Sequence, residues 1–293
     1  QENYTFSALT VSIDSDVSFE ALEGQDKLGI LQVPMDARFI INDGQHRRAA
    51  IIEALEHRPE LAHETIAVVF FLDIGLEHSQ QMFADLNRHA IRPSRSLGLL
   101  YDHRNEKAKL AKLVILESQI FRDIVEMEKS SLAKRSRKLF TLSAFYNACA
   151  DLVQDLASGD LVEDAILARE YWEAVAQHFP SWGQVKGGRM PASEVREGFI
   201  HSHGIALQAL GKAGNALLKQ DKNGWRSKLS ALEGIDWSRN NSAVWEGRAM
   251  SLGVVQKKNT NITLTTNFIK QAYEVPLTDD EQKLETAFLD SQT

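Results

Sequence analysis

The spacing of apolar and polar residues in the first third of the chain mixes strand and helix patterns. Residues 4–13 alternate with a period of two, which predicts a strand. Residues 65–72 form an almost continuous apolar run, which predicts a buried strand, and residues 45–57 carry apolar positions at helical spacing. Residues 18–28 predict a short helix or a loop, and residues 77–86 predict a helix. This part of the chain therefore reads as a small unit of strands and helices.

The remainder of the chain has the pattern of a helical domain. Helical periodicity covers residues 97–120, 141–156, 161–178, 191–218, 266–273 and 278–289. The last of these begins with Thr278, three residues before Glu281, which is the spacing of a capping box. Loops are expected at residues 180–183 and 186–189. We therefore expect an α+β protein, with an α/β domain over residues 1–95 and a mainly helical domain over residues 96–293.

The composition is that of a folded protein from a reducing compartment. Of 293 residues, 43% are hydrophobic and 25% charged, which excludes disorder over most of the length. Cys149 is the single cysteine, so an internal disulfide and a Cys-rich zinc site are excluded and a cytoplasmic location is favoured. The longest apolar run, residues 66–72, is far shorter than the roughly 20 residues of a membrane span. The chain starts at Gln1 without methionine, from which we expect an upstream segment in the native protein.

Positive charge is concentrated in one segment of an acidic chain. The formal net charge is −7, yet residues 86–140 hold 13 Lys and Arg against six Asp and Glu, a net of +7. A basic segment on an otherwise acidic protein is typical of one face that meets a polyanion, although it is also compatible with a solvated helix face. The densest part is residues 134–138, where serine and four cations suit contacts with phosphate.

One motif between a predicted strand and a predicted helix has the chemistry of an anion site. It reads Asp43-Gly44-Gln45-His46-Arg47-Arg48. Gly44 permits a tight backbone turn, and the helix that follows presents free N–H groups and the positive end of its dipole. Arg47 and Arg48 in the first helical turn add donors that match phosphate oxygens.

The other polar residues of the motif leave more than one interpretation open. Gln45 and His46 are placed to contact phosphate, bound water or a base. Asp43 is placed either to cap the helix or to hold a metal-bound water. The simpler alternative is a helix N-terminus capped by Asp43, with two exposed arginines and no ligand.

These residues are similar to the signature of the DGQHR-domain family and, within it, of DndB proteins. Residues 83–88, followed by Pro93 and Ser94, resemble the second element of the wider ParB/sulfiredoxin superfamily. Residues 245–248 and 264–270 resemble the C-terminal part of DndB proteins, so the resemblance covers most of the chain. It implies a ParB/sulfiredoxin-like N-terminal domain and a link to DNA phosphorothioation in bacteria and archaea. DndB proteins are associated there with negative transcriptional control of the modification genes.

The resemblance also implies a nucleotide site, because ParB-type relatives bind a nucleoside triphosphate through the arginine-bearing turn and some hydrolyse it with magnesium. Arg47 would contact the β- and γ-phosphates, and Asp43 or Gln45 would orient water or Mg²⁺. The implied nucleotide-binding residues are Gly44, His46, Arg47, Arg48, Asn87 and Arg88. Gln45 stands where sulfiredoxin has its nucleophilic cysteine, which excludes reduction of a sulfinic acid. A P-loop is excluded as well, because the chain has no such motif.

Three hypotheses for function follow, and the first is preferred. It is a DndB-like repressor that binds double-stranded DNA, with ATP or another nucleotide and Mg²⁺ as part of its mechanism. The expected DNA contacts are Arg92, Arg95, Lys134, Arg135, Arg137 and Lys138. The second is a DNA-stimulated NTPase of antiphage defence, as in SspE proteins, which carry a related DGQQR motif. The third is a scaffold that binds other phosphorothioation proteins. Self-association is expected because a two-fold operator needs two copies, and no membrane contact is expected.

We expect structural roles for the remaining histidine, cysteine and tryptophan side chains. His201 and His203 lie two residues apart, a spacing that does not place both on one helix face, so no metal site is expected. Cys149 lies in an apolar run, which indicates that its thiol is packed in the core. The five tryptophans predict core positions, and Trp245 with Arg248 is the pair that could instead support the nucleotide pocket or a subunit contact.

Overall fold

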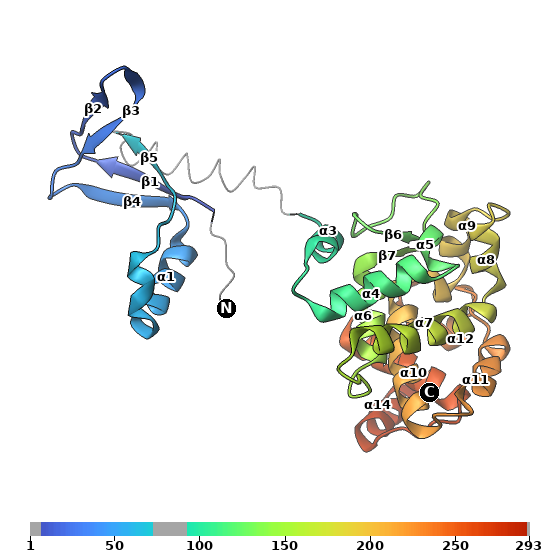
Figure 1. Cartoon of the computed structure of the whole chain (residues 1–293). Helices are drawn as coiled ribbons and strands as arrows, with labels where there is room; N and C mark the ends of the chain where they lie inside the picture. The colour runs from blue at the N-terminus through green and yellow to red at the C-terminus, as the bar shows by residue number, and fades with distance from the viewer. Residues whose placement is uncertain (1–6, 73–92, 292–293) are drawn as a thin grey trace. The chain divides into compact units, whose positions relative to one another are not determined.

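The computed structural model describes residues 7–72 and 93–291 and divides the chain into two compact units (Figure 1). Unit 1 comprises residues 1–92 and unit 2 residues 93–293, whereas the sequence placed the boundary after residue 95. Small sheets together with many helices confirm the α+β class.

Unit 1 is built on a three-stranded sheet of order β4-β1-β5. The central strand β1 (Leu9–Asp14) pairs antiparallel with β4 (Arg38–Asp43) and parallel with β5 (Val68–Leu72). Between β4 and β5 the chain forms α1 (Gln45–His57) and a short 3₁₀ helix, η1 (Pro59–His63). The predicted helix over 45–57 is confirmed, and it ends where the residue before a proline disfavours helical backbone.

Two expectations for unit 1 were wrong. Residues 18–28 form no helix. They belong to an antiparallel hairpin of β2 (Ser18–Leu22) and β3 (Gln25–Gln32), because the two-residue turn after β2 lets the strands pair. The strand predicted over 65–72 exists as β5, but four of its five side chains are exposed. It pairs only with β1, and no second layer from the described part of the chain buries it.

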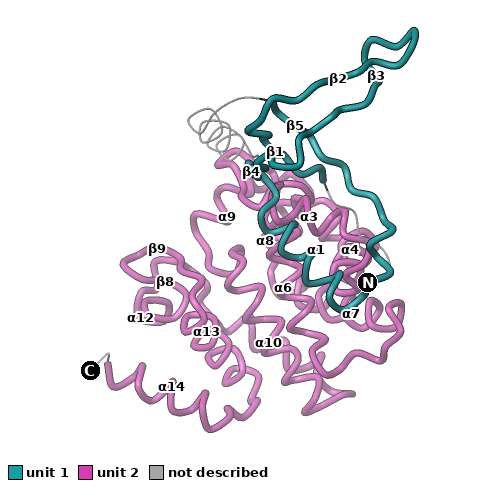
Figure 2. The backbone as a smooth tube through the Cα atoms, turned by 90° about the vertical axis from the view of Figure 1, so that its left-hand side faces the viewer, with its two compact units in different colours: residues 1–92 teal, residues 93–293 magenta. Residues whose placement is uncertain are grey.

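Unit 2 is organised around three long helices. The helix α10 (Gly204–Gln220) packs along both α6 (Leu142–Leu152) and α13 (Asn259–Ala272), as Figure 2 shows. The helices α6 and α10 approach so closely that a Cβ at Gly211 would lie 2.3 Å from the carbonyl oxygen of Ala148. This approach explains the glycine in the middle of a helix, where glycine otherwise costs stability.

The core of unit 2 is aromatic. The Phe121 ring lies 4.7 Å from Phe145 and 6.3 Å from Trp172 between centroids, and it also meets Trp182 at 5.8 Å. The core positions predicted for the tryptophans are confirmed, since all five are buried: Trp172, Trp182, Trp225, Trp237 and Trp245. Such ring pairs bury large areas and add specific edge-to-face contacts.

The single long helix expected over residues 97–120 is interrupted. The helix α3 (Arg95–Tyr101) ends before a turn in which Asp102 Oδ1 accepts hydrogen bonds from two following amides. Asn105 then caps α4 (Glu106–Glu117), with its side chain accepting from the Ala108 amide at 3.1 Å. Side-chain bonds of this kind compete with helical hydrogen bonds and divide the segment.

The helix expected over residues 191–218 is also divided, and the reason is tertiary. Between α9 (Ala192–Gly198) and α10 lies a 3₁₀ turn, η2 (Ile200–Ser202). The Ile200 amide donates to the carbonyl oxygen of Trp237 at 2.8 Å, so this backbone pairs with a distant segment. The loop expected at 180–183 is wrong too, because this segment begins α8 (Pro180–Lys186), with the proline in the first turn where it fits.

The other elements of unit 2 are short, except for the helices α7 and α14. They are α5 (Phe121–Ile124), β6 (Val125–Glu126), β7 (Phe140–Thr141), α7 (Leu161–Gln177), α11 (Trp225–Lys228), η3 (Leu229–Gly234), α12 (Ser242–Trp245), β8 (Met250–Ser251), β9 (Val254–Val255) and α14 (Asp279–Asp290). The predicted capping box of α14 is confirmed, with Thr278 and Glu281 each bonding the other's backbone amide.

Candidate functional site

The motif of residues 43–48 joins the end of β4 to the start of α1, as the sequence predicts. Gly44 is the N-cap and adopts the left-handed conformation, with φ of 110°. A Cβ at this position would lie 2.4 Å from Leu9 Cδ2, so both the backbone angle and the space select glycine. The turn is therefore set by glycine geometry and by the close approach of β1.

Arg47 binds within the turn rather than extending into solvent. Its Nη2 donates to Asp43 Oδ2 at 2.6 Å, and Nη1 donates to the Ser7 hydroxyl. Its buried Nε has no hydrogen-bond partner among the described residues. Asp43 does not cap α1, since the helix N-terminus has no side-chain cap bond. The interpretation of a capping aspartate with two exposed arginines is therefore wrong for Asp43 and for Arg47.

The remaining polar side chains of the turn are accessible. Gln45, His46 and Arg48 are exposed, and Gln45 Nε2 donates back to the Ile41 carbonyl oxygen at 2.9 Å. The first amides of α1 have no side-chain acceptor, and the helix dipole places partial positive charge there. An anion at this turn would meet these amides and the Arg48 guanidinium.

The residues present fit a nucleotide phosphate. The unpartnered Arg47 Nε is a buried donor that lacks an acceptor in the described part of the chain, and a phosphate oxygen is an acceptor of the required kind. Asp43 supplies one carboxylate beside the turn. Magnesium in nucleotide sites commonly takes one or two carboxylates and completes its shell with phosphate oxygens and water. Residues 7–72 and 93–291 hold no group of three or more His, Cys, Asp and Glu that would bind a metal by itself.

The second element expected to close this site lies outside the described residues. Asn87, Arg88 and Arg92 all fall in that part of the chain. Arg95 is described and lies at the start of α3, where its Nη2 donates to Asn147 Oδ1 at 2.9 Å. Its guanidinium also lies over the Tyr146 ring, 5.9 Å from the centroid. Arg95 is thus oriented by α6, in unit 2.

The cluster Lys134–Lys138, here called the basic loop, is held in place by an arginine that the sequence analysis did not select. Arg196 Nη2 donates to the carbonyl oxygens of Ala133, Lys134 and Ser136 at 3.1, 2.8 and 3.3 Å. Arg196 thereby binds the backbone of the loop and leaves the loop side chains out of these contacts. No local sequence signal connects residues about 60 positions apart, which is why this contact was missed.

The four cations of the basic loop are not equivalent. Lys138 donates to the Asp123 carbonyl oxygen at 2.8 Å, and Lys134 lies 3.5 Å from Glu197. Arg135 and Arg137 are exposed, and neither forms an ion pair with any described residue. The two lysines of the loop therefore have partners within the protein, whereas the two arginines have exposed side chains that can bind an anion.

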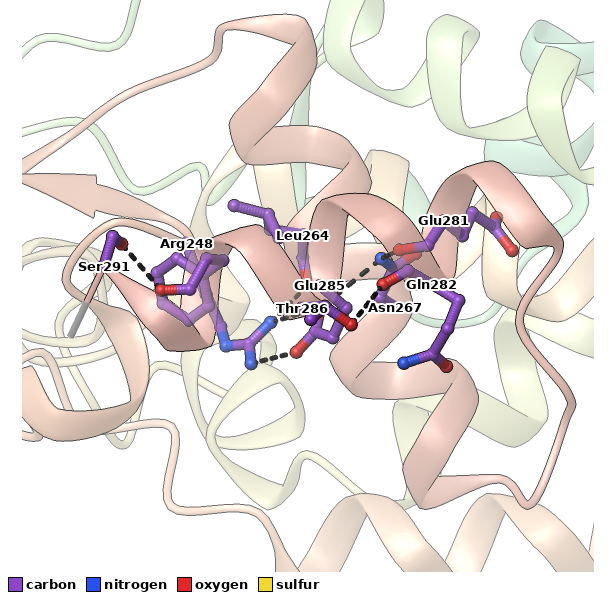
Figure 3. Close-up of polar contacts among 9 residues, drawn as sticks. Arg248, Leu264, Asn267, Glu281, Gln282, Glu285, Thr286 and Ser291 are labelled. Carbon is purple, nitrogen blue, oxygen red and sulfur yellow. Dashed lines mark hydrogen bonds and ion pairs between the residues drawn. The ribbon is translucent and has the colours of Figure 1, made fainter. Parts of the chain in front are cut away.

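The C-terminal motif that resembles DndB proteins forms a buried ion pair. Arg248 donates through both Nη atoms to the two carboxylate oxygens of Glu285 on α14, and its Nη1 also donates to the Leu264 carbonyl oxygen at 3.0 Å (Figure 3). Asn267 Nδ2 lies 3.4 Å from Glu285 Oε2. Both ionic partners are almost fully buried, with side chains 8% and 2% exposed.

This network joins α13 and α14 to the segment after α12. Arg248 is buried and paired in this network, so it is not available for a ligand in this arrangement. Lys270 and Glu281 make a second pair between the same two helices, at 2.5 Å. The sequence pointed to Arg248 but not to Glu285, because an acidic residue in an amphipathic helix ordinarily faces solvent.

The remaining candidates have structural partners. The Trp182 indole donates to His201 Nδ1 at 3.0 Å, and His203 Nε2 donates to the Arg196 carbonyl oxygen at 2.8 Å. Burial lowers the pKa of His201 to about 3 and that of His203 to about 4, so both rings are neutral near pH 7. Cys149 is fully buried, and burial raises the pKa of its thiol, as expected for a packed cysteine.

Together these observations define an α+β protein with a glycine turn entering a helix in one unit and an exposed pair of arginines in the other. Residues 1–276 match the family model of DndB, described as DNA-sulfur modification-associated, and the chain belongs to that family. Membership connects the chain to DNA phosphorothioation. Comparison with curated proteins and with solved structures returned no match. In residues 7–72 and 93–291, no helix combines the length and the apolar character needed to cross a membrane.

Proposed function

We propose that this chain is a regulator of DNA phosphorothioation that binds double-stranded DNA and represses the modification genes. The family match over residues 1–276 supports the connection to DNA sulfur modification. The observation that carries the DNA-binding part is the basic loop, which presents Arg135 and Arg137 without carboxylate partners among the described residues. Unpaired arginines on an exposed loop are suited to phosphate oxygens of the DNA backbone.

A nucleotide at the turn of residues 43–48 is the second part of the proposal. Gly44 and the first amides of α1 would bind the phosphates, assisted by His46, Arg48 and Arg47. Asp43 and Gln45 would orient Mg²⁺ or water, with Asn87 and Arg88 contributing from the second element. ATP or a related nucleotide bound there would change the affinity for DNA.

A DNA-stimulated NTPase is the alternative function, and one observation favours it. Arg47 pairs with Asp43, and its Nε has no partner among the described residues. A bound triphosphate with magnesium would supply an acceptor for this donor, and Arg47 would then stabilise the charge of the transferred phosphate. Hydrolysis would then be the output, as proposed for proteins of antiphage defence. A scaffold that binds other phosphorothioation proteins, and a homo-oligomer on a two-fold operator, remain compatible with either function.

The DNA-binding proposal is tested by titrating labelled duplexes with the purified chain in about 150 mM salt. The promoter of its own modification genes should bind at least tenfold more tightly than unrelated DNA of equal length. The Arg135→Ala/Arg137→Ala variant should bind every duplex more weakly. Because each phosphate contact contributes about 0.9 to the slope of log K against log salt, the variant should reduce that slope by about two.

A charge-matched control separates this effect from net charge. Lys222 and Lys283 are exposed, and Lys283 makes only a surface pair with Asp280 at 3.4 Å. The Lys222→Ala/Lys283→Ala variant loses the same charge and should retain both affinity and slope. Equal binding of promoter and unrelated DNA would contradict a role as a specific regulator. Equal losses of DNA affinity in both variants would contradict the assignment of DNA contacts to the basic loop.

The two functions are separated by measuring ATP turnover with Mg²⁺, in the presence and absence of duplex DNA. Turnover that rises with DNA and is lost in Arg47→Ala would support the NTPase. Nucleotide binding without turnover, together with a nucleotide-dependent DNA affinity, would support the regulator. Arg48→Gln is the matched variant, since it removes an exposed cation of the turn and leaves the Arg47–Asp43 pair in place.

A further inference from the structure

Unit 2 contains a cavity of about 430 Å³, which Lys134 of the basic loop lines but Arg135 and Arg137 do not. We call it the hydroxyl cavity, because serine and threonine side chains line it beside cations. The residues that matter to the argument are Ser131, Thr141, Ser193, Lys134, Arg196 and Gly204. It lies between the segment before the basic loop, the start of α6 and the junction of α9 with α10. Its volume is within the range of small-molecule sites.

One wall of the hydroxyl cavity carries the Arg196 guanidinium, which lies near the Glu197 carboxylate. Arg196 donates to backbone carbonyl oxygens through Nη2 and, at 3.3 Å, to the Ala192 carbonyl oxygen through Nε. It forms no ion pair within residues 93–291. Partial burial lowers the pKa of Arg196, and an arginine stays charged under all physiological conditions. Carbonyl dipoles offset its positive charge in part, and the charge of Glu197 opposes the effect of burial on its pKa.

A second cation, Lys257, lies near the cavity without lining it. The Lys257 ammonium is 3.7 Å from the position that a Cβ would take at Gly204, which lines the cavity. Partial desolvation and the charge of Arg95 lower the pKa of Lys257, while Asp151 opposes this effect. Lys257 makes no ion pair with a described residue. The one carboxylate lining the cavity, Glu197, already pairs with Lys134.

The neutral groups of the cavity are donors as well. The hydroxyl groups of Ser131 and Ser193 have no hydrogen-bond partner within the described residues, and each can rotate its proton toward a ligand. The 17-residue helix α10 begins at Gly204 without a side-chain cap, so its first amides add to the positive potential. The cavity thus combines Arg196, two hydroxyl groups and a helix start with the Lys134–Glu197 pair and an apolar floor, and Lys257 lies nearby.

We propose that the hydroxyl cavity binds a phosphate group. Excess positive charge disfavours a cation or an apolar ligand, and hydroxyl and guanidinium donors match the oxygens of a tetrahedral dianion. Two sources of that group fit the volume, a free mononucleotide and a phosphate of DNA. The proposal does not rest on the function of the turn in unit 1 or on Arg135 and Arg137, so it can fail or succeed independently of them.

The experiment is a calorimetric titration of the full chain with inorganic phosphate, with AMP and with a 20-base-pair duplex. Lys257→Gln removes the cation beside Gly204 and should weaken binding of phosphate or AMP about tenfold, because charge-assisted hydrogen bonds are the strong ones. Ser193→Ala should weaken it by a smaller factor. The control, Lys222→Gln, makes the same charge change beyond the far end of α10, roughly 25 Å away, and should bind within twofold of the parent.

The three ligands distinguish the sources. Tighter binding of AMP than of phosphate, both lost in Lys257→Gln, identifies a free nucleotide. Weaker duplex binding in Lys257→Gln, with phosphate and AMP bound poorly by every variant, identifies a DNA phosphate. The proposal is overturned if Lys257→Gln and Lys222→Gln bind all three ligands alike, or if none of the ligands binds at millimolar concentration.

Discussion

Residues 93–291 bury an extensive aromatic core around Phe121 and Trp172, whereas Val11 and Ile13 are the only buried apolar side chains in residues 7–72. Phe19, Ile30 and other large side chains of unit 1 remain exposed. Burial of apolar surface is the main favourable term in folding. Unit 2 therefore carries its own stabilising core, whereas residues 7–72 bury little apolar surface and depend more on the hydrogen bonds of their sheet.

The difference between the units shows where stability and chemistry reside. The turn of residues 43–48 belongs to the unit with little burial, while the basic loop is attached to the well-packed unit through Arg196. Regions with few buried apolar contacts open at lower free energy. We expect unit 1 to exchange its amide protons faster than unit 2 and the turn to adjust when a ligand binds.

The largest expected effect is in unit 2. Arg248→Ala would leave the buried Glu285 carboxylate without its partner and should lower the free energy of unfolding by about 3–5 kcal/mol. All five tryptophans lie in unit 2, so urea unfolding followed by tryptophan fluorescence measures this unit. Arg248→Met combined with Glu285→Leu should recover most of the loss. Lys283→Ala on the same helix should change stability by less than about 0.5 kcal/mol, and a similar loss in both variants would contradict the assignment.

The corresponding change in unit 1 is Ile13→Ala. Ile13 is fully buried in the central strand β1, and truncation should cost about 2–5 kcal/mol through lost burial and a cavity. Hydrogen exchange of the β1 amides should accelerate, while the tryptophan-detected midpoint of unit 2 stays unchanged. A shift of that midpoint by the same free energy would show that the two units unfold together, which would contradict a separate stability for each unit.

A smaller effect is expected at the turn. Gly44→Ala forces a side chain into φ of 110° and toward Leu9, which should destabilise unit 1 by about 1–3 kcal/mol. Faster exchange of the first α1 amides would measure it. Gly98→Ala in α3 is the counterpart, because a Cβ there meets nothing within 4 Å. It should stabilise unit 2 by up to about 1 kcal/mol, and equal destabilisation by both substitutions would argue against the strain at Gly44.

The last expected effect is a pH dependence of unit 2, which is measured as a slope rather than as a single loss of stability. His203 has a pKa lowered to about 4 in the folded protein, against about 6.5 in an unfolded chain. Below about pH 6.5 the unfolded state binds the proton more readily, so stability falls as pH drops toward about 4. The slope for this ring is about 1.4 kcal/mol per pH unit. His203→Gln should reduce the measured slope between pH 6 and 4.5 by about that amount, and an unchanged slope would contradict the burial of a neutral ring.

Local patterns predicted some elements to within a residue. The helix over residues 45–57 and the capping box at Thr278 are confirmed, because the hydrogen bonds that start and end a helix involve residues close in sequence. The hairpin of β2 and β3 was missed, because β-structure depends on pairing with another strand more than on local preference. The interruption at residues 199–203 was missed because Ile200 bonds to Trp237.

The candidate site likewise combines features that local sequence determines with features that depend on distant contacts. The sequence alone determined the α+β class, the glycine turn before α1, the basic loop and membership in a family tied to DNA sulfur modification. The tertiary structure decided that Arg47 pairs with Asp43 and Ser7, that Arg196 holds the basic loop, and that Arg248 is buried against Glu285. Residue types and short spacings limit what a segment can form, whereas the partner of a buried charge is chosen by packing between segments far apart in the chain.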